Sequence, residues 1–267
     1  MTRQSYKKPH RAKRKKPLFL KAAFWRFLGS AAFAGGAVWL AVFSPATQVR
    51  DITVAGTEKI NGDDCAKLIA DEVNKKVAFL DSKSILLFNL DQAKKELLAR
   101  FPQIQDIKIE RQFPSKIYAQ VLERREVAVF KASGDKRYLV DGDGIAFEAA
   151  PEGRVDLLEI APGREQEVAL GAEAISKNTL AAILRAKADI QALKNISVVG
   201  AVIATPERVN LQTSEGWFVY LDPLKDIDEQ LAKLGAVMDD DSFKSKRANL
   251  EYVDVRFTRV YLKEKSQ

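Results

Sequence analysis

The pattern of hydrophobic and polar positions divides the chain into three parts. The first 23 residues are mostly polar and show no apolar period, and the next 20, from Phe24 to Phe43, are predominantly apolar. From Val49 onward, apolar residues either alternate with polar ones, as in strands, or recur every three to four positions, as in amphipathic helices. The pattern therefore predicts a polar tail, an apolar helix and a folded α+β region.

The apolar segment has the length of a membrane span. Twenty helical residues rise about 30 Å, the thickness of the hydrocarbon core of a bilayer. Arg26 can extend its charge to the headgroups, and Trp25 and Trp39 suit the membrane interface. The alternative is a cleaved signal peptide, since Ser44–Ala46 supplies small residues, but the apolar core of a signal peptide spans only about 7–15 residues. We predict a retained transmembrane anchor over residues 24–45.

Charge predicts how the anchor is oriented. Residues 1–26 carry ten Lys or Arg and no acid, so the formal net charge of +7 comes from the tail and the rest of the chain is slightly acidic. Cytoplasmic flanks of membrane helices are enriched in Lys and Arg, which places residues 1–23 in the cytoplasm and the folded part outside. We expect residues 1–23 to be a disordered topology signal. Binding of this tail to nucleic acid or anionic lipid is the alternative.

The segment from residue 48 to 124 has the pattern of a small α+β module. It is predicted to run strand, helix, helix, strand, strand, with two helices covering one face of the sheet. Asn61 is a suitable N-cap for the first helix, and Cys65 lies on the apolar side of that helix. The two last strands, "IQDIKIER" and "KIYAQVLER", are separated by the turn "QFPS". The residues expected to share one core are Leu97, Ile107, Ile109 and Ile117.

The segment from residue 125 to 263 is predicted to be a mostly antiparallel β domain with two helices. Short alternating runs such as "RYLVD", "RVNLQT" and "WFVYLD" indicate strands, and helices are expected over residues 178–193 and 226–238. In the last segment, "YVDVRFTRVYLK", alternation places Val253, Val255 and Phe257 on one face. Residues 264–267 are read as a short tail.

The residue inventory excludes several kinds of active site. The only histidine is His10, in the basic tail, so the folded part has no Ser-His-Asp triad, no Cys-His pair and no histidine metal ligand. A single cysteine, Cys65, allows no intramolecular disulfide. Phosphate-binding motifs of the GxxxxGK[ST] and GxGxxG types are absent from the sequence. We expect no catalytic residues, no metal and no cofactor.

One segment has a partial likeness to a calcium loop. "DGDGIAFEAAPE" places Asp141, Asp143 and Glu152 at loop positions 1, 3 and 12. Positions 5 and 6 are Ile145 and Ala146, where a calcium loop needs an oxygen ligand and a glycine. The segment is therefore interpreted as the turn of a hairpin between "RYLV" and "IAF".

Three stretches together resemble the bacterial cell-division proteins of the FtsQ/DivIB family. They are "VRDITVAGTEKIN", "NLDQAKKELLARFPQIQDIKIERQFPSKIYAQVLERREVAVF" and "YVDVRFTRVYLK". In the second, the positions that match the family pattern are Arg111, Pro114, Ile117 and Glu123. The resemblance covers nearly the whole chain and implies a short cytoplasmic tail, a single anchor and a POTRA domain directly after it.

The resemblance implies a scaffold and not an enzyme. Family members join the division complex at the septum of the cytoplasmic membrane and bind two other single-pass proteins, of the FtsB (or DivIC) and FtsL types, which connect to the septal peptidoglycan synthase. We expect these partners, the bilayer through residues 24–45, and no nucleic acid or small-molecule substrate. Two alternatives remain: a membrane-anchored enzyme acting on the cell wall, and a POTRA protein of secretion or outer-membrane assembly.

The last strand is where we expect the partner to bind. A strand at a sheet edge has unpaired N–H and C=O groups that a partner segment can satisfy by strand addition. The candidate binding residues are Tyr252, Asp254, Arg256, Phe257, Arg259, Val260 and Tyr261. The simpler alternative is that Val253, Val255 and Phe257 fill the core and that Arg256 pairs with Asp254 or Glu251.

Overall fold

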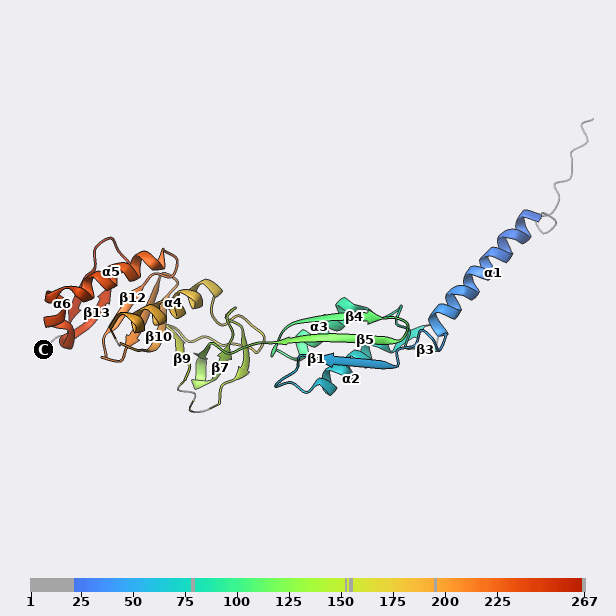
Figure 1. Ribbon diagram of the computed structural model, residues 1–267, viewed down its shortest axis with the longest axis horizontal. Coiled ribbons are helices and arrows are strands. Elements are labelled where there is room, and N and C mark those ends of the chain that lie inside the picture. The colour runs from blue at the N-terminus through green and yellow to red at the C-terminus, as the bar shows by residue number, and fades with distance from the viewer. Residues whose placement is uncertain (1–21, 78–79, 152, 154–155, 195, 266–267) are drawn as a thin grey trace, which may run out of the picture.

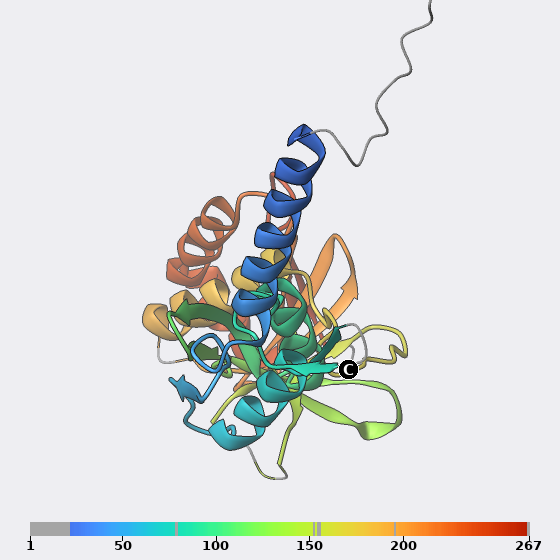
Figure 2. The same ribbon diagram turned by 90° about the vertical axis from the view of Figure 1, so that its right-hand side faces the viewer.

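The fold is an apolar helix followed by two folded bodies in a row (Figure 1). In this computed structural model, the described residues are 22–77, 80–151, 153, 156–194 and 196–265. The expected disorder of the basic tail therefore lies outside the described residues. We call the body built on β1–β5 the proximal module and the body built on β6–β14 the distal domain. Figure 2 views them from the side of the apolar helix.

The apolar segment forms the helix α1 (Ala22–Phe43). It has a mean hydropathy of 1.4, and none of it is buried inside the protein. With 22 residues, α1 is long and apolar enough to cross a bilayer. The side chains of α1 therefore face outward in every direction, as expected for a helix whose surroundings are lipid.

The proximal module has a three-stranded sheet in the order β1-β5-β4. Strand β1 (Asp51–Ala55) pairs in parallel with β5 (Lys116–Glu123), which pairs antiparallel with β4 (Ile104–Gln112). The helices α2 (Gly62–Val73) and α3 (Leu90–Arg100) pack on this sheet and on each other. The predicted order of strand, helix, helix, strand, strand is therefore confirmed, and the sequence missed one small hairpin, β2 (Lys75–Val77) with β3 (Leu80–Ser82).

The capping residue and the core residues predicted for the proximal module occupy the predicted positions. The Asn61 side chain accepts a hydrogen bond from the backbone of Asp63 at 2.9 Å and caps α2. Cys65 and Leu97 are completely buried. One hydrophobic cluster contains Leu97, Ile107 and Ile117, and the partly buried Ile109 packs against it. The predicted shared core is confirmed.

The distal domain is built on a nine-stranded sheet in the order β14-β13-β12-β11-β10-β9-β6-β7-β8. Its strands are β6 (Ala128–Lys131), β7 (Arg137–Val140), β8 (Ala146–Ala149), β9 (Leu158–Pro162), β10 (Val198–Thr205), β11 (Arg208–Thr213), β12 (Phe218–Leu221), β13 (Leu250–Asp254) and β14 (Tyr261–Glu264). Five neighbouring pairs are antiparallel, and the three parallel pairs are β6–β9, β9–β10 and β12–β13. The sheet is mostly antiparallel, as predicted.

Helices α4 (Lys177–Lys194) and α5 (Ile227–Asp239) flank this sheet and contact each other. Both begin and end within a residue of their predicted bounds. The short helix α6 (Asp241–Lys246) was not predicted. Its Phe243 is buried and packs edge-on against Trp217, with ring centroids 6.0 Å apart.

The hairpin prediction for residues 137–149 is confirmed, because β7 and β8 pair antiparallel. The Asp141 side chain accepts hydrogen bonds from the backbone N–H of Asp143 and Ile145 inside the turn. It also forms a short ion pair with Arg124, which comes directly after β5. The Asp141 carboxylate is therefore occupied in holding the turn and in joining the proximal module to the distal domain.

Candidate partner-binding surface

Strand β14 lies at one end of the nine-stranded sheet. It pairs only with β13 among the described strands, with Tyr261 opposite Asp254 and Leu262 opposite Val253. All four residues of β14 are exposed. The outer edge of β14 therefore presents backbone N–H and C=O groups that have no strand beside them within the described part of the chain.

The chain leaves β13 through a loop, residues 255–260, before it returns as β14. Val253 and Val255 are fully buried, and the backbone N–H of Val255 still donates to Tyr220 of β12 at 3.2 Å. Past Val255 the alternation ends, and Phe257 is 48% exposed. The alternative that Phe257 fills the core together with the two valines is wrong, because β13 ends at Asp254 and the loop leaves Phe257 at the surface.

A two-point ion pair fixes the start of the 255–260 loop. The Arg256 guanidinium donates to the Asp254 carboxylate with Nε–Oδ1 at 2.9 Å and Nη2–Oδ2 at 2.6 Å. Asp254 is only 6% exposed and also accepts from the backbone N–H of Arg256. These side-chain hydrogen bonds raise the pKa of Arg256 above its ordinary value. The predicted local pairing of Arg256 with Asp254 is confirmed.

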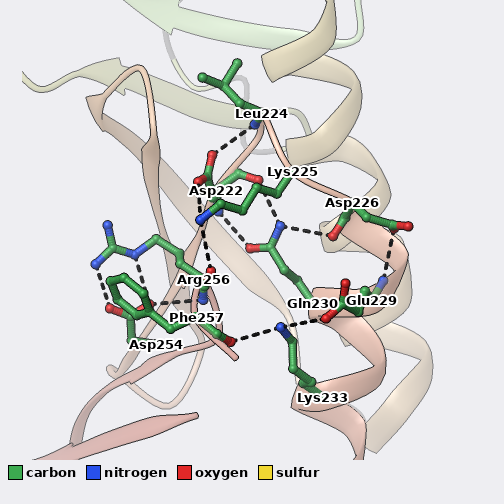
Figure 3. Close-up of polar contacts among 10 residues, drawn as sticks. All are labelled: Asp222, Leu224, Lys225, Asp226, Glu229, Gln230, Lys233, Asp254, Arg256 and Phe257. Carbon is green, nitrogen blue, oxygen red and sulfur yellow. Dashed lines mark hydrogen bonds and ion pairs between the residues drawn. The ribbon is translucent and has the colours of Figure 1, made fainter. Parts of the chain in front are cut away.

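Two lysines hold the same loop from the other side (Figure 3). Lys225 Nζ donates to the carbonyl oxygen of Arg256 at 3.3 Å, and Lys233 Nζ donates to that of Phe257 at 2.9 Å. Lys233 belongs to α5 and also pairs with Glu229 one turn earlier, at 3.2 Å. These hydrogen bonds therefore hold the loop between the end of β13 and the start of α5.

A buried glutamine positions α5 for this contact. Gln230 is 2% exposed; its Oε1 accepts from the backbone N–H of Asp222 at 2.8 Å, and its Nε2 donates to the carbonyl oxygens of Asp222 and Asp226 (Figure 3). Asp226 caps α5 by accepting from the backbone N–H of Asp228 and Glu229. The helix start, the end of β12 and the loop thus form one hydrogen-bonded unit.

A hollow of about 590 Å³ opens between α5 and the loop. Its lining contains more cations than acids. The ten lining residues are Lys225, Asp226, Glu229, Gln230, Lys233, Arg256, Phe257, Thr258, Arg259 and Tyr261. Four of these are Lys or Arg and two are acidic, but three of the cations pair with carboxylates: Lys225 with Asp222, Lys233 with Glu229 and Arg256 with Asp254. Arg259 is the exposed cation of the lining that these ion pairs do not include.

Aromatic side chains border both the hollow and the edge strand. Phe257 and Tyr261 are 48% and 55% exposed, and their rings meet edge to face with centroids 5.9 Å apart. The Arg256 guanidinium lies 5.0 Å from the centre of the Phe257 ring. On the adjoining sheet face, Tyr220 and Tyr252 stack at 4.5 Å. Exposed, preorganised aromatic and arginine side chains of this kind dominate the binding energy of many interfaces.

Two family models match this chain: one covers the proximal module, and the other covers the distal domain as far as Arg256, before β14. Residues 47–124 match the POTRA domain of FtsQ type, and residues 128–256 match the C-terminal domain of cell division protein FtsQ/DivIB. The chain belongs to the FtsQ/DivIB family. The first matched segment is the proximal module, which is therefore a POTRA domain.

Curated relatives agree with this assignment. The cell division protein FtsQ of Streptomyces bingchenggensis is 28% identical over 156 residues, which are 58% of this chain and 54% of the relative. The FtsQ of Streptomyces coelicolor is 24% identical over 163 residues, which are 60% of this chain and 58% of the relative. The chain thus matches less than two thirds of the length of these relatives.

The structure places the seven predicted binding residues of this FtsQ/DivIB protein close together, in three different settings. Phe257, Arg259 and Tyr261 are exposed and line the hollow. Tyr252 is half-buried in the aromatic stack, and Val260 packs against the core of the distal domain. Asp254 and Arg256 form an ion pair with each other. Asp254 therefore contributes to the surface by positioning Arg256.

Sequence reasoning missed the contribution of α5 to this surface. Lys225, Glu229 and Lys233 line the hollow, although nothing in the sequence connects them with the last strand. The spacing of Glu229 and Lys233 indicates an ordinary helical ion pair, which they do form. Only the packing of α5 beside the 255–260 loop shows that they belong to the candidate surface. Among the described residues, no group of three or more His, Cys, Asp or Glu is placed to hold a metal ion.

Proposed function

We propose that this protein is a non-enzymatic, membrane-anchored scaffold of the bacterial division complex. Its partner is the outer segment of a single-pass division protein of the FtsB (or DivIC) type, held together with one of the FtsL type. The observation that carries the proposal is the exposed strand β14, which has no neighbour on its outer side among the described strands. A partner segment that adds a strand there satisfies its own backbone and that of β14.

The surroundings of β14 supply specificity for such a segment. Backbone pairing gives affinity without regard to sequence, whereas pockets beside the strand select side chains. In the hollow next to Tyr261, Lys225 and Lys233 pair with Asp222 and Glu229, and the exposed Arg259 is the cation that suits an acidic side chain of the partner. Phe257 and Tyr261 offer exposed aromatic surface for an apolar one. The scaffold holds its partner at the end of the distal domain farthest from α1 along the chain.

Membrane placement follows from α1 and the tail. A predominantly apolar helix of 22 residues, preceded by nine cations and carrying a tenth at Arg26 near its start, orients with its N-terminus in the cytoplasm. The POTRA domain and the distal domain then lie outside the cytoplasmic membrane, at the division septum. In this arrangement the protein brings partners together and performs no chemistry itself.

Site-directed photocrosslinking in dividing cells tests the proposal. A photoreactive amino acid is introduced at Leu262, in β14, and in a separate variant at Ala149, in β8. These positions lie on the first and last strands of the same sheet, and both are exposed. Crosslinks to the FtsB-type or FtsL-type protein are expected from Leu262 and not from Ala149. Equal crosslinking from both edges, or crosslinks from Ala149 alone, would contradict strand addition at β14.

A further inference from the structure

The anchor and the POTRA domain are joined by hydrogen bonds and not only by the chain. The last carbonyl groups of a helix have no partner within the helix. Here the carbonyl oxygen of Ala41 accepts from Thr47 Oγ1 at 2.7 Å, and that of Val42 accepts from Gln48 Nε2 at 2.8 Å and from Ser82 Oγ at 3.0 Å. One end of the POTRA domain is therefore held against the end of α1.

Three segments of the POTRA domain meet at this end. The backbone N–H of Ile85 donates to Thr47 at 2.9 Å, and that of Arg50 donates to Ser115 at 2.8 Å. Arg111 donates through its guanidinium to the carbonyl oxygen of Phe88 at 2.6 Å. These bonds bring together residues 47–50, the turn after β3 (residues 84–88) and the β4–β5 turn (residues 112–115). Figure 1 shows β3 and the β4–β5 turn on the side from which α1 leaves.

The tips of both turns carry apolar side chains. In the first, Leu87 N–H bonds to Ser84, and Leu86 and Leu87 are 46% and 38% exposed, while Ile85 points into the protein. In the second, Phe113 is 65% exposed. Gly, Asn, Asp, Ser and Pro are common in turns because of the backbone conformations and local hydrogen bonds that they allow, and the second turn has Pro114 and Ser115 after Phe113. Turn chemistry does not require the exposed Leu86, Leu87 and Phe113, and exposed apolar side chains that lie together mark an interaction surface.

The exposed apolar side chains are unevenly distributed over the POTRA domain. Its described part has five large ones, and they are Leu80, Leu86, Leu87, Phe113 and Leu122. The first four belong to β3, to the turn after it and to the β4–β5 turn, on the side of α1. Only Leu122 lies at the other end of β5, next to the distal domain.

Exposed cations flank the two tips. Lys83 precedes the first turn, Lys116 follows the second, and Arg50 lies between them in space. Their exposed acidic neighbours are Asp51, which pairs with Lys116 at 3.4 Å, and Asp81. Apolar side chains bordered by cations suit the boundary of a bilayer, where the apolar groups enter the interface and the cations meet anionic headgroups.

We propose that this end of the POTRA domain is a second membrane contact, in which Leu86, Leu87 and Phe113 enter the headgroup region of the leaflet where α1 emerges. The occupant is a lipid surface because the tips continue an existing membrane contact: they lie beside the residues that cap α1. The contact fixes the orientation of the POTRA domain relative to the bilayer, and through Arg124 and Asp141 that of the distal domain as well. The inference rests on α1 spanning the membrane.

Spin-label accessibility tests the contact in the full chain. The protein is reconstituted in vesicles of phosphatidylethanolamine and phosphatidylglycerol, with a nitroxide on Leu86→Cys or Phe113→Cys. The matched control is Leu122→Cys, an apolar site of the same domain whose exposure lies between those of Leu86 and Phe113, and Val38→Cys reports α1. Native Cys65 is fully buried, and the unsubstituted chain measures any labelling there. Accessibility to oxygen, which concentrates in lipid, is compared with accessibility to a water-soluble nickel chelate.

The expected result is an oxygen-to-nickel accessibility ratio several-fold higher at Leu86 and Phe113 than at Leu122. Introducing Leu86→Asp should lower the ratio at the Phe113 label, and Leu122→Asp should not. A ratio at both tips equal to that at Leu122, with a lipid-like ratio at Val38, would overturn the membrane contact while leaving the anchor intact. A water-like ratio at Val38 would overturn both. Labels at the tips that are shielded from both reagents would show that a protein, such as a second copy, covers this end.

Discussion

Arg256 and Asp254 form a two-point ion pair at the end of β13, with heavy-atom distances of 2.9 and 2.6 Å. Only 8% of the Asp254 side chain and 19% of the Arg256 side chain are exposed. The pair lies where β13 ends. The following loop runs beside α5, and Lys225 and Lys233 donate hydrogen bonds to its carbonyl oxygens. The shape of the candidate surface therefore depends on two residues that contribute little of its exposed area.

Arg256→Ala should destabilise the distal domain by about 3 kcal/mol, because it leaves the buried carboxylate of Asp254 without its cation. Arg256→Lys should cost less, since it keeps the charge and loses the two-point geometry. Urea unfolding followed by the fluorescence of the buried Trp217 measures both. Arg259→Ala, at an exposed position of the same loop, is the control and should change the free energy of unfolding by less than about 0.5 kcal/mol. An equally small effect of Arg256→Ala would show that the pair does not stabilise the domain.

Tyr261→Ala should weaken partner binding by about 1–3 kcal/mol, as expected for an exposed aromatic hot spot, with little change in melting temperature. Arg259→Glu should slow association if the partner is acidic there. Both are measured with the full chain in nanodiscs and purified outer segments of FtsB-type and FtsL-type proteins. Leu170→Ala, exposed and distant from β14 in the sequence, is the matched control. Undiminished affinity of Tyr261→Ala would place the binding energy elsewhere on the surface.

Glu123 should make the POTRA domain sensitive to acid. Burial by itself raises the pKa of this carboxyl, but hydrogen bonds from the backbone N–H groups of Ile60, Lys59 and Glu58 outweigh it and hold the pKa below its usual value. The stabilisation is therefore complete above the unfolded-state pKa of about 4.3 and is lost as the pH falls through the folded-state value.

Glu123→Gln should consequently lower the free energy of unfolding by about 1 kcal/mol at neutral pH, and its difference from the unsubstituted chain should shrink below about pH 4. Circular dichroism during urea unfolding at several pH values measures this. For Asp71→Asn, at an exposed position of α2, the difference in the free energy of unfolding from the unsubstituted chain should not shrink at low pH. If the difference in the free energy of unfolding between Glu123→Gln and the unsubstituted chain is independent of pH, the negative charge of Glu123 contributes nothing to stability.

Leu97→Ala should lower the stability of the POTRA domain by about 2–5 kcal/mol, because Leu97 is fully buried between α3 and the sheet and the change leaves a cavity. Urea unfolding followed by circular dichroism measures the loss of stability, and hydrogen exchange shows whether the loss is confined to the POTRA domain. Lys95→Ala, exposed on the same helix, is the control. A loss below about 0.5 kcal/mol would be incompatible with the buried position of Leu97.

The sequence by itself determined the elements whose signals are local. The N-cap at Asn61 and the alternation of Ile107 and Ile109 in β4 each depend on a few neighbouring residues, so the sequence predicts where the helix begins and which side of the strand is buried. The apolar helix α1 was equally readable, because a long run of apolar residues has no other stable environment than lipid or a core. The family resemblance, carried by the order of these elements, was also visible in the sequence.

The tertiary structure alone decided how distant elements meet. Strands β12 and β13 pair in parallel although α5 and α6 separate them in the sequence, and this pairing brings α5 beside the 255–260 loop. Periodicity states which face of a strand is buried, but not which strand is its neighbour or where it turns. For that reason the alternation put Phe257 on the same face as the core residues Val253 and Val255, whereas the end of β13 at Asp254 leaves it at the surface. The meeting of two apolar turn tips beside α1 is likewise a product of long-range hydrogen bonds that no local pattern contains.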